Sequence, residues 1–229
     1  MSELKTFVKD QIWTSTVPFR FYGIETGAKM TILKLNNGDL FVHSPVKLTE
    51  KLKSEIDKIG KVKYLVSPNH LHHLYLGDFS KSYPKARVYA SPGLKKKVKG
   101  IKFDAELEEG MSEPWSDEVE MKFFVGSLII DEALFFHKKS RTLITTDMIQ
   151  CYSKDAPFFT RIAGWINGCY PEHGVPRDLC LSTIFKRKQC RKSVKNILRW
   201  DFEKVIFSHA EDIKSGGKEM FKKCFAWIL

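Results

Sequence analysis

Three of the seven histidines in this chain fall within four positions of one stretch, Ser67 to Phe79, which reads SPNHLHHLYLGDF. Neutral imidazole is the commonest metal ligand that proteins offer. Alternate side chains of an extended backbone point the same way, so His70 and His72 would face one ion together while His73 points elsewhere. The competing interpretation is a polar loop without a metal. Two ligands do not complete a site, so the others must come from distant parts of the chain.

Two more polar residues each end an apolar, strand-like run: Asp147 follows LITT, and His209 follows VIFS. Open α/β sheets gather their ligands at the carboxyl ends of strands, and the histidine loop also leaves such an end. If these strands are neighbours, His70, His72, Asp147 and His209 would meet and act as metal ligands. Three nitrogens and one oxygen suit zinc or iron. The sequence therefore predicts one divalent ion, with zinc favoured over iron, against the alternative of no ion.

The elements that would position these residues alternate between strands and helices. A hairpin is expected over 29–44, because Asn36-Asn37-Gly38 is strong turn chemistry between two β-rich arms. The spacing of apolar residues predicts further strands and helices along the chain. The expected strands are 62–66, 87–90, 119–125, 128–136, 142–149 and 204–210. The expected helices are 48–60, 76–82, 158–166, 178–186, 192–200 and 218–229, with 158–166, 178–186 and 192–200 each burying one apolar face.

This order resembles the metallo-β-lactamase-like superfamily, whose signature is His-x-His-x-Asp-His followed by glycines. His70 and His72 match the first two histidines of that signature, and Gly77 falls on a glycine position. The resemblance places Asp147 at the bridging aspartate and His209 at the last histidine, so it gives both a catalytic role. It implies an α/β fold, a four-layer αββα sandwich, formed by residues 1–229 as a single domain.

The resemblance covers nearly the whole chain in order and spacing, and it points to a divergent branch of the superfamily. The features that favour this branch are Asn69, the run His43-Ser44-Pro45 and the run SRTLITTD. Leu74-Tyr75 stands where the signature has Asp-His, and no histidine lies near residues 126–128. A binuclear centre is therefore not expected. Either the four remaining residues hold one ion, which we favour, or the site is decayed.

Four other polar residues have two interpretations each. His43 either orients a ligand or is a hydrogen-bonded core histidine. Glu132 either pairs with Arg141 or serves as a general base. The ion pair is favoured, because a buried carboxylate needs a partner. His73 and His173 either contact a substrate or are loop residues without a role. His137 is expected at the surface.

Composition limits the classes of protein that this chain can represent. Hydrophobic residues make up 43% of its 229 residues, which is enough for packed layers. The five cysteines are odd in number and form no Cys-x-x-Cys pair, so we expect reduced thiols in a cytoplasmic protein. No run is apolar enough to span a membrane, and no membrane partner is expected. The net charge of +11 favours anionic partners.

The sequence supports two alternative functions. The first is a metal-dependent hydrolase with a mononuclear site that acts on an ester-type substrate, either a small molecule or an anionic compound. The second is a catalytically decayed protein of the same fold that binds a ligand or nucleic acid through its lysine runs. Nucleic acid is the weaker partner, since few aromatic residues are interleaved with the lysines. Iron-dependent redox chemistry ranks last.

Overall fold

The structure, a computed structural model, describes residues 3–21 and 24–229. The chain divides into two compact units, and the C-terminal unit includes a short segment from within the sequence range of the N-terminal unit. The N-terminal unit consists of Met1–Val17 and Ala28–Trp115, and the C-terminal unit consists of Pro18–Gly27 and Ser116–Leu229. Each unit has its own sheet and its own apolar core.

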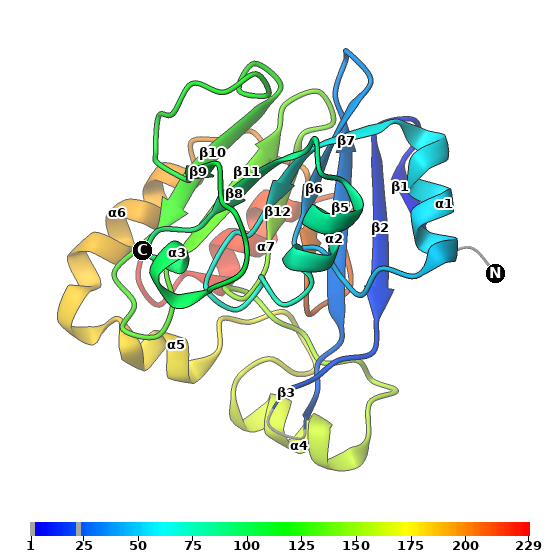
Figure 1. The fold of residues 1–229 in the computed structure, drawn as a ribbon. Helices are drawn as coiled ribbons and strands as arrows, with labels where there is room; N and C mark the ends of the chain where they lie inside the picture. Colours follow the sequence, from blue (N-terminus) through cyan, green and yellow to red (C-terminus); the bar gives the residue numbers. More distant parts are fainter. Residues whose placement is uncertain (1–2, 22–23) are drawn as a thin grey trace. The chain divides into compact units, whose positions relative to one another are not determined.

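The N-terminal unit is built on a seven-stranded sheet in the order β1-β2-β5-β6-β7-β8-β9 (Figure 1). The strands from β1 to β6 pair antiparallel, and those from β6 to β9 pair parallel. The carboxyl ends of β6, β7 and β8 therefore share one edge. The strands are β1 (Lys5–Val8), β2 (Ile12–Val17), β5 (Ala28–Lys34), β6 (Asp39–His43), β7 (Lys61–Val66), β8 (Arg87–Ala90) and β9 (Ala105–Glu106).

Three helices complete this unit: α1 (Glu50–Ile59), α2 (Leu76–Ser82) and α3 (Leu94–Lys97). Helices α1 and α2 both pack against β7 and lie on the same face of the sheet (Figure 1). The side chain of Thr49 accepts a hydrogen bond from Leu52 N and so caps α1, which buries Leu52 and Ile56. The predicted hairpin is β5 and β6, and Gly38 in its turn has φ +85°, a conformation that suits glycine.

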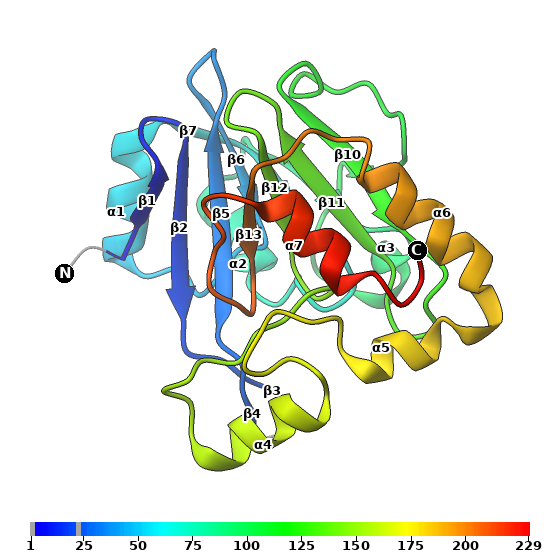
Figure 2. The ribbon, with the colours of Figure 1, turned by 180° about the vertical axis from the view of Figure 1, so that it is seen from behind.

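The C-terminal unit is built on a four-stranded sheet, β10 to β13, in which only β12 and β13 pair parallel. Helix α6 packs against β10 and α7 against β13, on one face of the sheet (Figure 2). The strands are β10 (Val119–Phe124), β11 (Glu132–His137), β12 (Thr142–Thr145) and β13 (Lys204–Phe207), with a separate pair, β3 (Arg20–Phe21) and β4 (Ile24–Glu25). The helices are α4 (Phe158–Ile166), α5 (Arg177–Ser182), the 3-10 turn η1 (Ile184–Lys186), α6 (Arg187–Ile197) and α7 (Gly217–Cys224).

Most predicted elements are confirmed within a few residues, but the burial predicted for 158–166 and the start predicted for the strand at 128 are wrong. Helix α4 buries only Thr160 and Gly164 and exposes its large apolar side chains. A methyl group at Gly164 would lie 2.6 Å from the Tyr152 ring, so the helix packs closely through its small residues. The strand expected from 128 begins only at Glu132, because residues 128–131 form a hydrogen-bonded loop around Ser127.

All five cysteines are free thiols, and burial is the largest cause of the pKa changes at Cys169 and Cys224. Burial raises the pKa of Cys169 and Cys224 to about 12, so both stay protonated at neutral pH.

Across the part of the chain that the structure describes, no helix has the length and apolar character needed to cross a membrane.

Candidate metal centre

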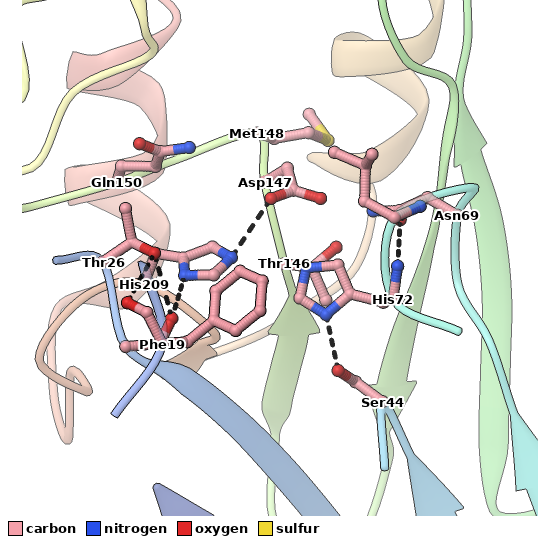
Figure 3. A network of polar contacts seen from close by, with 12 residues as sticks. Phe19, Thr26, Ser44, Asn69, His72, Thr146, Asp147, Met148, Gln150 and His209 are labelled. Atoms are coloured by element: carbon pink, nitrogen blue, oxygen red, sulfur yellow. Dashed lines mark hydrogen bonds and ion pairs between the residues drawn. The ribbon is translucent and has the colours of Figure 1, made fainter. Parts of the chain in front are cut away.

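Asp147 and His209 meet because β12 and β13 run parallel. Thr145 pairs with Phe207 in the ladder, and each functional residue lies two positions beyond its strand's paired residue. The Asp147 Oδ1 and His209 Nε2 atoms are 3.2 Å apart, and the side chains are only 12% and 10% exposed (Figure 3). The predicted convergence of the LITTD and VIFSH strand ends is therefore confirmed for this pair.

The backbone fixes which nitrogen of His209 faces Asp147. His209 Nδ1 lies 2.8 Å from the Gly27 carbonyl oxygen, which can only accept, so Nδ1 carries the hydrogen. In the neutral ring, the Nε2 lone pair then points at a carboxylate oxygen. Two lone pairs at this distance repel each other unless a cation, either a proton or a metal ion, lies between them. This donor arrangement fits a metal ion.

Without a metal ion, protonation of His209 at Nε2 would remove the repulsion between its lone pair and the Asp147 carboxylate. Burial has the largest effect and lowers the pKa of His209, but the Asp147 carboxylate and the Gly27 and Thr26 carbonyls together raise it above its usual value. A ligand histidine in metalloproteins commonly donates its second N–H to a backbone carbonyl in this way, which sets the ring orientation.

Glu132 organises the turn that carries Asp147. Its carboxylate is fully buried and accepts four hydrogen bonds, which come from the Thr145 hydroxyl and from three backbone N–H groups. The backbone donors are Thr146 N at 2.6 Å, Asp147 N at 2.8 Å and Met148 N at 3.2 Å. Burial, followed by the charge of Asp147, raises the pKa of Glu132.

The predicted Glu132–Arg141 ion pair is wrong. Arg141 instead pairs with Asp201, with 2.8 Å between Arg141 Nη2 and Asp201 Oδ1. Arg141 lies at the opposite end of the β11–β12 hairpin from Glu132, since β12 starts at Thr142 and Glu132 meets the residues just after β12 ends. The partner of the buried carboxylate is thus a set of backbone donors, which no charge pattern in the sequence announces.

The histidine loop after β7 is a tight turn, so the expectation of an extended backbone is wrong. The Asn69 Oδ1 atom accepts hydrogen bonds from Leu71 N at 2.8 Å and His72 N at 3.0 Å. The Ser67 hydroxyl donates to the carbonyls of Asn69 and His72. Such Asx-type bonds curl the backbone, and alternate side chains of a turn diverge.

His70 and His72 accordingly reach different partners. His72 Nδ1 lies 2.6 Å from the Ser44 hydroxyl (Figure 3). His70 is exposed, and its Nε2 lies 2.5 Å from the Pro92 carbonyl oxygen. Ser44 follows β6 and has φ +54°, an uncommon conformation for a residue with a side chain. Ser44 is one residue that the sequence reasoning missed as a ligand partner, although its run HSP was singled out.

The other histidines are divided between the core and the loops. His43 is buried at the end of β6, and burial followed by His72 lowers its pKa to about 3. His73 is half-buried, and burial lowers its pKa. The Nε2 atom of His173 bonds the Glu211 carbonyl at 2.9 Å, and its ring packs on Phe207. The surface position expected for His137 is wrong, since it is 1% exposed.

Solved structures with the same arrangement of elements are metallo-β-lactamases. The DIM-1 enzyme exposed to ceftazidime is 15% identical, with a TM-score of 0.66 over 98% of this chain and 96% of its own. The enzyme from Pontibacter korlensis is 13% identical, with a TM-score of 0.66 over 99% of both chains. FIM-1 from Pseudomonas aeruginosa, in its mono-zinc form, is 11% identical, with a TM-score of 0.60 over 96% of this chain and 92% of its own.

These matches confirm the predicted α/β fold of metallo-β-lactamase type and the resemblance on which it was based. At such low identities they establish the fold alone. No curated protein matches the chain. The family model described as "Domain of unknown function (DUF4336)" matches residues 9–164, and the chain belongs to this family.

Proposed function

We propose that the protein is a metal-dependent hydrolase with a single divalent ion, zinc in preference to iron, held by His72, Asp147 and His209. The observation that carries the proposal is the Nε2 of His209 facing the Asp147 carboxylate at 3.2 Å, with Nδ1 already committed to a backbone carbonyl. Asp147 and His209 belong to the C-terminal unit, and the sequence prediction supplies His72, from the turn after β7, as the third ligand.

His70 was predicted as a fourth ligand, and the proposal leaves it out. Its Nε2 is bonded to the Pro92 carbonyl, and the turn around Asn69 directs it away from the partner of His72. His72 has the features of a held ligand: it is partly buried, and its Nδ1 bonds Ser44. This difference between two neighbouring histidines makes His70 the natural control.

Bound at these three residues, a divalent ion would supply Lewis acidity toward a carbonyl or phosphoryl oxygen. The residues of the chain would do the rest. Asp147 would accept a hydrogen bond from the attacking water and orient it, and His209, whose Nδ1 donates to the Gly27 carbonyl, would present Nε2 to the ion. Glu132 fixes the backbone of Asp147, and Ser44 fixes the ring of His72.

The charge of the chain bears on the class of substrate. The net charge of +11 favours an anionic ester-type substrate, such as a phosphodiester or a thioester with a negatively charged carrier. That a related fold holds a single zinc is supported by the FIM-1 enzyme, which has been solved in a mono-zinc form.

Elemental analysis of protein purified without added metal tests the ligand set. We expect about one zinc per chain in the unaltered protein and in the His70→Ala variant, and less than about a tenth of that in His72→Ala and His209→Ala. Hydrolysis of generic phosphodiester, ester and thioester substrates should follow the metal content across the same four proteins.

Circular dichroism of each variant separates loss of metal from loss of fold. Equal loss of zinc in His70→Ala and His72→Ala would contradict the three-residue set and restore the four-residue prediction. Folded, unaltered protein that takes up no zinc, iron or manganese on dialysis would sink the hydrolase and favour the decayed, ligand-binding alternative.

A further inference from the structure

Helix α4 presents an apolar face to solvent. Five large side chains on this nine-residue helix are exposed, and Phe159 is 82% exposed. The helix is held against its unit through Thr160 and Gly164, so the exposure follows from close packing on the opposite face. The exposed residues are Phe158, Phe159, Ile162, Trp165 and Ile166.

A second group of exposed apolar side chains lies around the end of α5. Leu128 N donates to the Ser182 carbonyl, and the hydroxyls of Ser127 and Ser182 are 2.8 Å apart, so the 128–129 loop lies beside this helix end. Phe185 is 85% exposed. The residues of this group are Leu128, Ile129, Leu181, Ile184 and Phe185.

Helices α4 and α5 are tied together within the C-terminal unit. Arg177, at the start of α5, donates through its side chain to the Ile166 carbonyl at the end of α4, and its backbone N–H bonds the Asn167 side chain. Both helices lie at the same end of this unit in two opposite views (Figures 1 and 2). We call the two groups of exposed residues together the apolar surface.

The chain that follows the apolar surface is strongly basic. Residues 184–200 contain seven lysines and arginines and no aspartate or glutamate. Cys190, Ser193, Val194 and Ile197 form the buried face of α6, so its cationic side chains lie on the exposed face. The cationic residues are Lys186, Arg187, Lys188, Arg191, Lys192, Lys195 and Arg199.

We propose that the apolar surface and the basic face of α6 dock the protein on an anionic lipid membrane. Contiguous exposed apolar patches mark interaction sites, and protruding Phe, Trp, Leu and Ile beside Lys and Arg are what an interfacial contact requires. The rings insert at the headgroup boundary, and the cations contact acidic headgroups. The charge pattern favours this partner over an apolar protein groove, because such a groove offers no acidic groups to the seven lysines and arginines. The proposal departs from the expectation of no membrane partner.

Co-sedimentation of the full chain with vesicles tests this proposal. We expect binding to phosphatidylcholine vesicles that contain about 30% phosphatidylserine, and little binding to pure phosphatidylcholine. The double variant Phe159→Ser with Phe185→Ser should bind at least roughly tenfold more weakly. Both side chains are more than 80% exposed, so their loss leaves the fold intact.

Two lysine runs allow a charge-matched control. The triple change Lys186→Gln, Lys188→Gln and Lys192→Gln should weaken binding roughly tenfold. The same number of changes at Lys95, Lys96 and Lys97 of α3 in the other unit should leave it within about twofold. Equal weakening by both triple variants would reduce the effect to net charge and overturn the proposal.

Other occupants of the surface give distinct results. Self-association seen by light scattering, and lost in the Phe159→Ser, Phe185→Ser protein, would assign the apolar surface to a second copy of the chain. Tight binding to single-stranded RNA that depends on Lys188 and Lys192, with no binding to anionic vesicles, would assign the basic face to nucleic acid. Either outcome would overturn membrane docking.

Discussion

At the scale of single residues, the carboxylate of Glu132 is fully buried and accepts four hydrogen bonds. One oxygen, Oε1, accepts from Thr145 Oγ1 and Thr146 N, and the other, Oε2, accepts from Asp147 N and Met148 N. The four donors belong to the last residue of β12 and to the turn after it, which presents Asp147. An acceptor with two equivalent oxygens is needed, and only a carboxylate supplies it at this size.

The Glu132→Gln variant tests this role, because glutamine keeps the volume but replaces one acceptor oxygen with a donor. Two buried donors then lose their partner, which should lower the free energy of unfolding by about 2–4 kcal/mol. The zinc dissociation constant, measured by competition with a chelator, should rise roughly tenfold or more, because Asp147 is no longer held.

Thr145→Val is the matched control for Glu132→Gln. It removes one of the four donors and leaves the carboxylate and its three backbone bonds in place. We expect a smaller loss of stability and an unchanged zinc affinity. If Glu132→Gln bound zinc as tightly as the unaltered protein, Glu132 would be a packing residue and not a positioning one.

At the scale of elements, the turn between β7 and α2 decides which histidine is held. Its shape depends on Asn69, which is fully buried and caps two successive backbone N–H groups. The turn leaves the carboxyl end of a parallel strand, where Ser44 from the end of the neighbouring strand β6 reaches His72. Parallel pairing thus sets the distance between the two partners.

Asn69→Ala should open this turn and release His72. Leaving the part-buried N–H groups of Leu71 and His72 without an acceptor should cost about 2 kcal/mol of unfolding free energy and weaken zinc binding roughly tenfold. Thr49→Ala is the comparison, since it removes one N–H acceptor at the start of α1, at a cost of about 1 kcal/mol. Zinc titrations that show the same weakening in both variants would mean that general loosening, and not the turn, controls the site.

At the scale of the whole molecule, buried neutral histidines tie stability to pH. Burial, followed by the charge of Lys139, lowers the pKa of His137 to about 4. The unfolded chain has a histidine pKa near ~6.5 and so binds one more proton than the folded chain between these values. Stability is therefore fully present above about pH 6.5 and is lost as the pH falls toward about 4. His43, with a pKa lowered to about 3, acts in the same direction in the other unit.

Urea unfolding at several pH values between about 5 and 6.5 measures this dependence. Each buried histidine should contribute a slope that rises from about 0.7 kcal/mol per pH unit at about pH 6.5 to about 1.4 near about pH 5. His137→Asn can retain a hydrogen bond to Ser140 while removing the titration, so its slope should be lower by that amount. An unchanged slope in His137→Asn would show that His137 titrates normally in the folded protein.

The path of the chain is also a property of the whole molecule. Residues 18–27 come early in the sequence yet belong to the C-terminal unit, where Gly27 accepts the hydrogen bond of His209. The two residues are 182 positions apart in sequence. No local pattern marks Gly27 as a partner of a functional histidine, since its contribution is a backbone carbonyl that every residue possesses.

The sequence by itself determined the elements, because their signals are local. Apolar periodicity and turn residues such as Asn37-Gly38 and Gly60 predicted the β5–β6 hairpin and α1, while α2 and β8 were predicted at their observed bounds. The metallo-β-lactamase fold was indicated by a family resemblance, which His70, His72, Asp147 and His209 carry in the sequence.

The tertiary structure alone decided which polar atoms face each other. The turn at Asn69 separated His70 from His72, and the register of β12 on β13 set Asp147 against His209. Glu132 found backbone donors and not Arg141, and α4 turned its aromatic residues outward because Gly164 had to meet Tyr152. Each of these outcomes depends on contacts between separate segments, whose geometry is fixed by packing and not by the residues of either segment alone.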